Sequence, residues 1–130
     1  MKIFCTLLFL ISSASAFACK CLEFNVGEYL KFSNKVYLGE VVSFEGFGTD
    51  GLMSVSLKVN ERFVGETFNI EEVIVNTRSG CRVLLDTGET FLVFEPKGGR
   101  VNNCIMRNVK NVPDLQWNLK ALRKIRQLGI

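Results

Sequence analysis

Two cysteines separated by one residue, Cys19 and Cys21, follow directly after Ala16-Phe17-Ala18. Small residues at 16 and 18 are typical of a signal-peptidase site, and cleavage after Ala18 would make Cys19 the first residue of the mature chain. Its free α-amino nitrogen and its carbonyl oxygen would then form a bidentate metal ligand. A catalytic zinc ion keeps one coordination position open, so this pair could displace a water molecule and chelate the zinc of another protein.

The first 18 residues have the layout of a secretory signal. Lys2 precedes an apolar run from Ile3 to Ile11, which is too short to span a bilayer, and the sequence has no second long apolar segment. We therefore expect a signal peptide at 1–18 and one small domain at 19–130. The protein should be secreted and extracellular, or located in the periplasm or cell envelope if its source is bacterial, and it should have no transmembrane segment.

The remaining cysteines predict a disulfide framework. Five cysteines are present, and Cys5 would leave with the signal peptide. An even number in a short exported chain indicates paired cysteines. A bridge between Cys19 and Cys21 would be badly strained, because only one residue separates them. Both should therefore reach into the body of the chain, to Cys81 and Cys104 in either order.

The composition gives no support for an enzyme or a nucleic-acid-binding protein. The sequence has no histidine, which removes the commonest general base and the commonest metal ligand. Its 16 basic and 13 acidic residues give a net charge of only +3. We expect a monomer with no catalytic residue, no cofactor of its own and no nucleic-acid partner. The acidic residues scattered along the predicted strands should lie on solvated faces; these are Glu61, Glu66, Glu71 and Glu72.

Local patterns place a short helix before a series of strands. Residues 25–33 predict a helix that Asn25 would cap. Its inward-facing residues would be Val26, Tyr29, Leu30 and Phe32. Alternation then predicts a first strand over 36–44 and a second over 53–60, with one buried and one solvated face. The second strand would point inward at Met53, Val55, Leu57 and Val59.

Glycine-rich turns separate the later strands, and a helix follows them. Further strands are expected over 68–75 and 91–94, and near Val101 and Cys104. Pro113-Asp114 predicts the start of a helix, and its apolar residues Leu115, Leu119, Leu122 and Ile125 recur at helical spacing. Its basic residues Lys120, Arg123, Lys124 and Arg126 are expected on a solvated outer face. Five strands with one helix near each end predict a mainly β protein with an OB-like, five-stranded closed barrel.

The whole of 19–130 resembles the N-terminal, netrin-like (NTR) inhibitory domain of the tissue inhibitors of metalloproteinases. The first matching feature is Cys19-Lys20-Cys21 directly after the signal. The second and third are the strands Val36-Tyr37-Leu38-Gly39-Glu40-Val41-Val42 and Val55-Ser56-Leu57-Lys58-Val59-Asn60-Glu61-Arg62-Phe63-Val64-Gly65. The last is Ser79-Gly80-Cys81 followed by Glu89 to Phe94 and Cys104.

The resemblance implies a secreted protein inhibitor of zinc metalloendopeptidases. It implies the disulfides Cys19–Cys81 and Cys21–Cys104, and an inhibitory ridge that contacts the protease. The ridge residues would be Cys19, Lys20, Cys21, Leu22, Ser79 and Gly80. The partner would be a zinc metalloendopeptidase whose catalytic zinc is bound by the backbone nitrogen and oxygen of Cys19.

Lys20 departs from the family pattern. The residue after the first cysteine is usually small and hydroxylated in these inhibitors, and its side chain enters a specificity pocket of the protease that is usually apolar. Burying an unpaired ammonium there costs several kcal/mol. The target would therefore need an acidic or open pocket, or the Lys20 ammonium would have to reach solvent.

Two other interpretations fit the same start of the chain. Netrin-like modules also serve as extracellular or cell-envelope binding modules without inhibitory activity. In addition, Ala16-Phe17-Ala18-Cys19 loosely resembles a bacterial lipoprotein cleavage site, at which Cys19 would be lipidated and its amine acylated. A lipidated Cys19 could neither form a disulfide nor chelate a metal.

Overall fold

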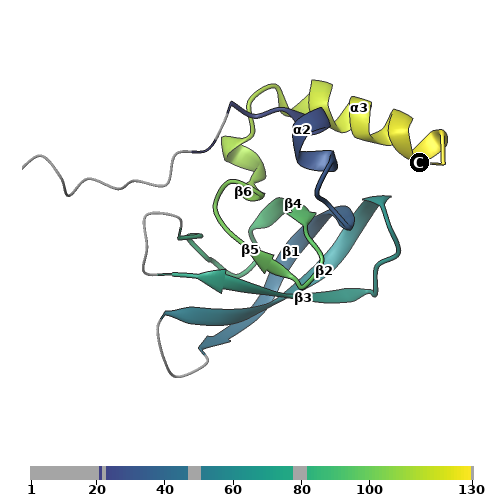
Figure 1. Cartoon of the computed structure of the whole chain (residues 1–130). Coiled ribbons are helices and arrows are strands. Elements are labelled where there is room, and N and C mark those ends of the chain that lie inside the picture. The colour runs from purple at the N-terminus through teal and green to yellow at the C-terminus, as the bar shows by residue number, and fades with distance from the viewer. Residues whose placement is uncertain (1–20, 22, 47–50, 78–81, 130) are drawn as a thin grey trace, which may run out of the picture.

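The structure is a computed structural model that describes residues 21, 23–46, 51–77 and 82–129. It is mainly β, with a short helix before the strands and a longer helix after them (Figure 1). In chain order the elements are α2 (Val26–Leu30), β1 (Lys35–Gly46), β2 (Leu52–Val64), β3 (Ile70–Asn76), β4 (Thr90–Glu95), β5 (Arg100–Val101), β6 (Met106–Asn108), the 3-10 helix η1 (Val109–Asn111) and α3 (Leu115–Gln127).

The strands form one curled half-barrel sheet in the order β5-β3-β2-β1-β4-β6. All neighbours are antiparallel except β3 and β5, which run parallel. The sheet curls so that its edge strand β5 also lies against β4. The sheet therefore has six strands rather than the five expected, because the three-residue β6 pairs with β4. Closure into an OB-like barrel stays a prediction.

The long hairpin of β1 and β2 confirms the alternation in the sequence. Val55 and Leu57 are fully buried, while Lys58 and Asn60 are exposed. Three irregularities in register occur along this pair, and each lets the strands twist and bend. The third predicted strand begins later than expected, at Ile70, so Phe68 precedes β3 and remains exposed.

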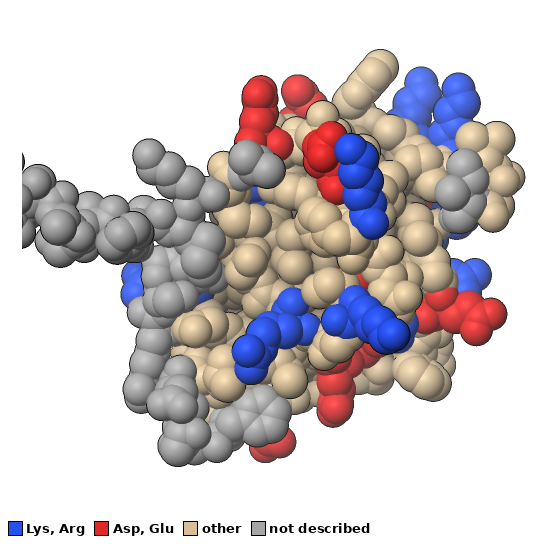
Figure 2. All heavy atoms as spheres, viewed as in Figure 1, with Lys and Arg blue, Asp and Glu red and all other residues tan. Residues whose placement is uncertain are grey.

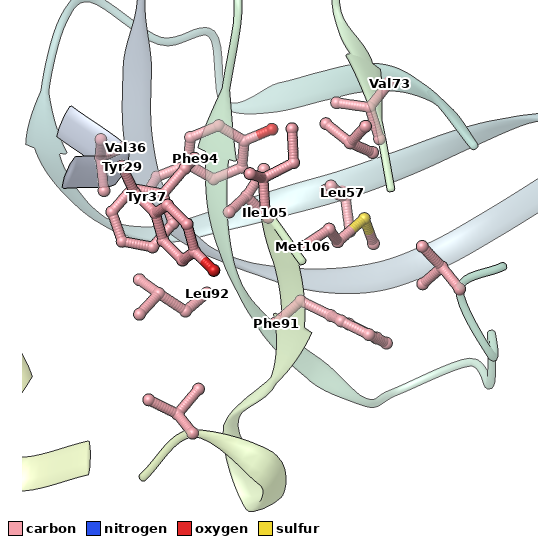
Figure 3. Close-up of a cluster of buried hydrophobic side chains, with 14 of the residues drawn as sticks. Tyr29, Val36, Tyr37, Leu57, Val73, Phe91, Leu92, Phe94, Ile105 and Met106 are labelled. Atoms are coloured by element: carbon pink, nitrogen blue, oxygen red, sulfur yellow. The ribbon is translucent and has the colours of Figure 1, made fainter. Parts of the chain in front are cut away.

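The core lies inside the curl of the sheet (Figure 3). Strand β4 contributes more buried apolar residues to it than any other element, from Phe91 to Phe94, and Glu95 at the end of the strand is buried as well. This strand lies between β1 and β6, and its neighbours provide Tyr37 and Met106. A strand buried on both faces is a continuous apolar run rather than an alternating one, which is the pattern of Phe91-Leu92-Val93-Phe94.

Helix α2 follows the predicted cap but is shorter than predicted. The Asn25 side chain accepts a hydrogen bond from the Glu28 backbone nitrogen at 3.2 Å, and this satisfies one free donor of the first turn. Val26 and Tyr29 are buried. The helix ends at Leu30 instead of residue 33, and Phe32 is 49% exposed rather than inward-facing.

Helix α3 packs on β2 through the residues that its spacing predicts. Leu119 and Leu122 are buried, and Leu115 and Ile125 are partly buried against the same core. Asp114 takes the N-cap position with a left-handed backbone, but its side chain makes no capping hydrogen bond. The Asn118 side chain instead donates to the Pro113 carbonyl at 2.8 Å. Neither α3 nor any other helix in the described residues is long and apolar enough to cross a membrane.

Candidate functional site

Of the predicted ridge, the structure describes Cys21. Cys19, Lys20, Leu22, Ser79 and Gly80 lie outside the described residues. Cys81 does too, so the Cys19–Cys81 disulfide and the position of the mature N-terminus stay predictions. Within the described residues, the candidate site therefore consists of Cys21, its attachment to the sheet and the residues from 23 onward.

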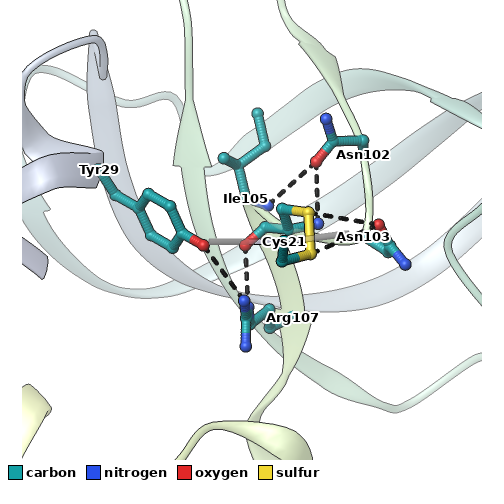
Figure 4. The surroundings of a disulfide bond; sticks show 7 residues. Cys21, Tyr29, Asn102, Asn103, Ile105 and Arg107 are labelled. Atoms are coloured by element: carbon teal, nitrogen blue, oxygen red, sulfur yellow. Dashed lines mark hydrogen bonds between the residues drawn. A yellow bond between two sulfur atoms is a disulfide. The ribbon is translucent and has the colours of Figure 1, made fainter. Parts of the chain in front are cut away.

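Cys21 is joined by a disulfide to Cys104, which is one of the two pairings that the family resemblance implies (Figure 4). The two Cα atoms are 5.3 Å apart, and the cysteines are 83 positions apart in sequence. Cys104 lies in the turn between β5 and β6. The bridge thus ties the chain, two residues after Cys19, to the turn that leads into one edge strand of the sheet.

Side-chain amides hold the turn that carries Cys104. The Asn102 side-chain oxygen accepts hydrogen bonds from the backbone nitrogens of Cys104 at 2.8 Å and Ile105 at 3.3 Å. An amide that bonds the backbone two and three residues on fixes a tight turn. The Asn103 side-chain oxygen lies 3.6 Å from the Cys104 sulfur and 3.9 Å from the Cys21 sulfur. The bridge is therefore anchored on a turn whose backbone shape is set by its own residues.

Arg107 connects this turn to helix α2. Its Nε donates to the Cys104 carbonyl at 2.9 Å, and its Nη2 donates to the Tyr29 hydroxyl at 3.2 Å. Its guanidinium also lies over the Phe24 ring, 5.0 Å from the centroid. A planar guanidinium can stack and donate at once, so one side chain holds the disulfide turn, the helix and the segment between them.

An aromatic cluster fixes the segment that follows Cys21. The centroid of the Phe24 ring lies 5.4 Å from that of Tyr29 and 6.0 Å from that of Phe94, and both pairs are edge to face. Tyr29 in turn meets Phe94 at 5.3 Å. Edge-to-face pairs contribute about 0.5–1.5 kcal/mol each beyond their buried area. The chain is therefore held against the core from Phe24 onward as well as by the disulfide.

A hollow of about 620 Å³ lies beside Cys21. Its apolar lining includes the buried residues Val83, Phe91 and Met106. Its polar lining consists of Arg82, Asp86, Glu89, Asn103, Arg107, Asn108 and Asn111. Glu89 accepts hydrogen bonds from Asn108 at 2.9 Å and Lys110 at 3.2 Å, which lower the pKa of this carboxyl. Glu89 thus stays ionised on the lining of this hollow.

Glu71 does not lie on a solvated face as the sequence suggested. It is only 4% exposed, and both of its carboxylate oxygens accept hydrogen bonds from Lys35, at 3.0 and 3.1 Å. One of them also accepts the Phe68 backbone N–H at 2.8 Å. Burial of the Glu71 carboxylate is tolerated because its partner Lys35 arrives from β1, 36 residues away in sequence.

Glu95, which the sequence did not single out, shares Lys35 with Glu71. It is 6% exposed, lies 3.9 Å from the Lys35 ammonium and accepts the Tyr37 hydroxyl at 2.8 Å. Burial raises the pKa of the Glu95 carboxyl; the Tyr37 hydrogen bond opposes that change, and the nearby Glu71 adds to it. Burial also raises the pKa of the Tyr37 hydroxyl, which therefore remains a donor. Lys35, Tyr37, Glu71 and Glu95 are bonded to one another, and none of them lines the hollow beside Cys21.

Glu61 is also paired rather than merely solvated. It accepts two hydrogen bonds from Arg123, both at 2.9 Å, and one from Arg126 at 2.9 Å. Arg123 and Arg126 therefore attach α3 to β2 instead of only facing solvent as the sequence suggested. The two hydrogen bonds from Arg123 and the one from Arg126 lower the pKa of the Glu61 carboxyl despite the opposing effect of burial.

In the part of the chain that the structure describes, no group of three or more Cys, Asp or Glu side chains is placed to hold a metal ion. The described arrangement is a disulfide-anchored segment at Cys21 beside a partly polar hollow. No protein-family model matches this chain, and no curated protein matches it.

Proposed function

We propose that this protein is a secreted inhibitor of zinc metalloendopeptidases and that mature N-terminal Cys19 chelates the target's zinc. The observation that carries the proposal is the Cys21–Cys104 disulfide. It anchors the chain two residues after Cys19, at the place where such an inhibitor must be rigid. The resemblance of 19–130 to netrin-like inhibitory domains supports the same conclusion.

The chemistry requires only the backbone of Cys19. Its α-amino nitrogen and carbonyl oxygen would take the place of the water molecule on a catalytic zinc. An α-amino group titrates near pH 8 and binds a metal only when unprotonated, so inhibition should weaken as the pH falls. The proton released on binding leaves to solvent.

The described contacts would lower the cost of docking. A free chain end must lose conformational entropy when it enters an active site, and prior immobilisation removes part of that loss. The disulfide, the Arg107 hydrogen bonds and the packing of Phe24 hold the chain on both sides of residue 22. The predicted Cys19–Cys81 disulfide would fix the chelating residue itself.

The decisive experiment compares the processed protein with a form extended by one alanine before Cys19. Mass spectrometry first establishes that Cys19 is the N-terminus of the parent protein. We expect the parent to inhibit at least one member of a panel of zinc endopeptidases at or below micromolar concentration, and the extended form to be inactive. A parent that leaves the whole panel active, or equal inhibition by both forms, would contradict the proposal.

Lys20 should decide which proteases are inhibited. Each 1.4 kcal/mol changes affinity tenfold, so an unpaired ammonium in an apolar specificity pocket would weaken binding by orders of magnitude. We expect Lys20→Thr to tighten inhibition of proteases with apolar pockets and to weaken it for those with acidic pockets. Unchanged inhibition constants for both groups would show that residue 20 does not enter the pocket.

A non-inhibitory netrin-like binding module is the alternative, and the hollow beside Cys21 favours it. That hollow offers a partly apolar, partly polar surface that does not depend on a free amine. A binding module would keep its partner after the one-residue extension, whereas the inhibitor would not. An intact mass that includes a lipid on Cys19 would exclude chelation altogether.

A further inference from the structure

The outward side of α3 combines two large apolar residues with two lysines. Counted at 3.6 residues per turn, Trp117, Lys120, Lys124 and Leu128 fall within about 80° of the helix circumference. This outer face lies on the opposite side of the helix from Leu119 and Leu122, which are buried, with 6% and 0% of their surfaces exposed. Trp117 is 74% exposed and Leu128 is 67% exposed. A tryptophan so exposed is unusual, because this residue is highly buried on average.

The charge of α3 is of one sign. The helix contains Lys120, Arg123, Lys124 and Arg126 and no acidic residue. Arg123 and Arg126 are engaged with Glu61 on β2. Lys120 and Lys124 are exposed and form no ion pair within the described residues. Figure 2 shows Lys and Arg side chains projecting at the end of the molecule where Figure 1 places α3.

We propose that the outer face of α3 docks on a membrane surface that contains anionic phospholipids. Complementary charge brings the helix to the lipid head groups, where Lys120 and Lys124 remain at the level of the phosphates. Trp117 and Leu128 enter the boundary between head groups and acyl chains, the region that exposed tryptophans prefer.

The apolar ends of the outer face favour a bilayer over a soluble polyanion. Trp117 and Leu128 are eleven residues apart, which is about 16 Å along the helix axis, so both reach a flat surface only when the helix lies parallel to it. A sulfated polysaccharide would pair with the two lysines but would leave the indole and the leucine in water. The inference does not depend on Cys19 or on protease inhibition.

The expected affinity is modest and strongly dependent on charge. Each basic residue close to an anionic surface contributes about a fivefold gain in affinity at physiological ionic strength. Neutralising both lysines should therefore reduce partitioning by about 25-fold. Raising the salt concentration should weaken binding in the same direction, because these charges are exposed to solvent.

Trp117 is the single tryptophan of the sequence, so its fluorescence reports on this face directly. The protein, as processed by the cell that makes it, is titrated with vesicles of phosphatidylcholine containing 30 mol% phosphatidylserine and with pure phosphatidylcholine vesicles. We expect a blue shift of the emission with the anionic vesicles only. No shift with the anionic vesicles, or an equal shift with both kinds, would overturn the proposal.

Matched pairs of variants distinguish binding through the outer face of α3 from binding through the net charge of the whole protein. Lys120→Gln with Lys124→Gln should weaken partitioning by about 25-fold, while Lys58→Gln with Lys97→Gln, which removes two exposed lysines elsewhere, should change it less than threefold. All share the same N-terminus, and circular dichroism checks that each is folded. Equal losses in both pairs would overturn the proposal. So would binding to immobilised heparin without any partitioning into anionic vesicles.

Discussion

Two segments, Cys21 to Lys35 and helix α3, are attached to the same sheet by different means. The N-terminal segment from Cys21 to Lys35 is held by a disulfide at one end and by a buried carboxylate cluster at the other. Helix α3 is held by two buried leucines and by a half-exposed pair of arginines on Glu61. The first attachment combines a covalent bond with two buried carboxylates, whereas the second is spread over three turns and is open to solvent on one side.

This difference matches what each end is proposed to do. A chelating terminus must keep one position, so a covalent link close to Cys19 suits it. A docking helix must only keep one face outward, and packing of the opposite face is enough for that. The attachments should therefore respond differently when they are weakened, and four changes test this, from the largest expected effect to the smallest.

Removal of the disulfide should have the largest effect. The double variant Cys21→Ser with Cys104→Ser opens a loop whose ends are 83 positions apart, which corresponds to about 4.5 kcal/mol of unfolding free energy on the loop-entropy model. Urea unfolding followed by circular dichroism measures this loss. Protease inhibition should disappear under conditions where the variant is still folded, while vesicle partitioning through α3 should remain. A loss below about 1 kcal/mol would show that other contacts already hold the segment.

Leu122→Ala should have the next largest effect. Leu122 is fully buried between α3 and the sheet, and truncating a buried leucine typically costs about 2–5 kcal/mol. Gln116→Ala, at an exposed position of the same helix, is the matched control and should change the unfolding free energy by less than about 0.5 kcal/mol. Similar values for the two variants would mean that α3 does not depend on this packing.

Glu61→Gln should cost less, and the cost should depend on pH. The pKa of the Glu61 carboxyl is lowered from its ordinary value of 4.5 by its arginine partners. The stabilisation that the ionised Glu61 gives to the folded state is therefore fully present above pH 4.5 and is lost as the pH falls through the lower, folded-state pKa. Because the pair is partly exposed, we expect a loss of about 1 kcal/mol or less at pH 7. The difference in unfolding free energy between parent and variant should shrink as the pH is lowered from 7 through 4.5 and below; a difference that stays constant over that range would contradict this.

Glu95→Gln should have the smallest effect and the opposite sign. Burial raises the pKa of the Glu95 carboxyl, so the folded protein binds its proton more tightly than the unfolded chain does. The free energy of unfolding therefore falls as the pH rises from the unfolded-state pKa through the folded-state pKa. At pH values above the raised pKa the variant should be slightly more stable than the parent, and the gain should shrink as the pH falls through that pKa. Glu71→Gln is the control and should destabilise, because Glu71 accepts three hydrogen bonds. A loss of stability in both variants would show that the ionised forms of both Glu71 and Glu95 stabilise the fold through their hydrogen-bond and ion-pair partners.

The sequence predicted those features that depend on neighbouring residues. The Asn25 cap, the alternation from Met53 to Val59 and the leucine spacing of α3 are local patterns, and the structure confirms them. Strand β6 was missed because three residues carry too little periodicity to show a strand. The surroundings of Glu61 and Glu71 were misjudged because an isolated strand pattern gives no information about side chains that arrive from 62 or 36 residues away.

The candidate site also has features that are local in sequence and features that depend on the fold. A Cys-Xaa-Cys after a cleavage site is a local signal, and the sequence alone could propose its chemistry. Which cysteine pairs with Cys104 is a non-local fact that came only from the family resemblance. Arg107 was missed as a positioning residue, since its three contacts join the turn, the helix and the intervening segment, which adjoin only in the fold. Its place just after Cys104 was the available signal.

The 83-residue separation of the bridged cysteines also constrains how this protein is made. A ribosome that adds roughly 5–20 residues per second needs about 4–17 s to go from the first of these cysteines to the second. During that interval the Cys21 thiol is already synthesised while its partner does not yet exist. Oxidation of this pair therefore cannot precede the synthesis of Cys104. The constraint that the bridge places on the residues near Cys21 arises only after Cys104 has been translated.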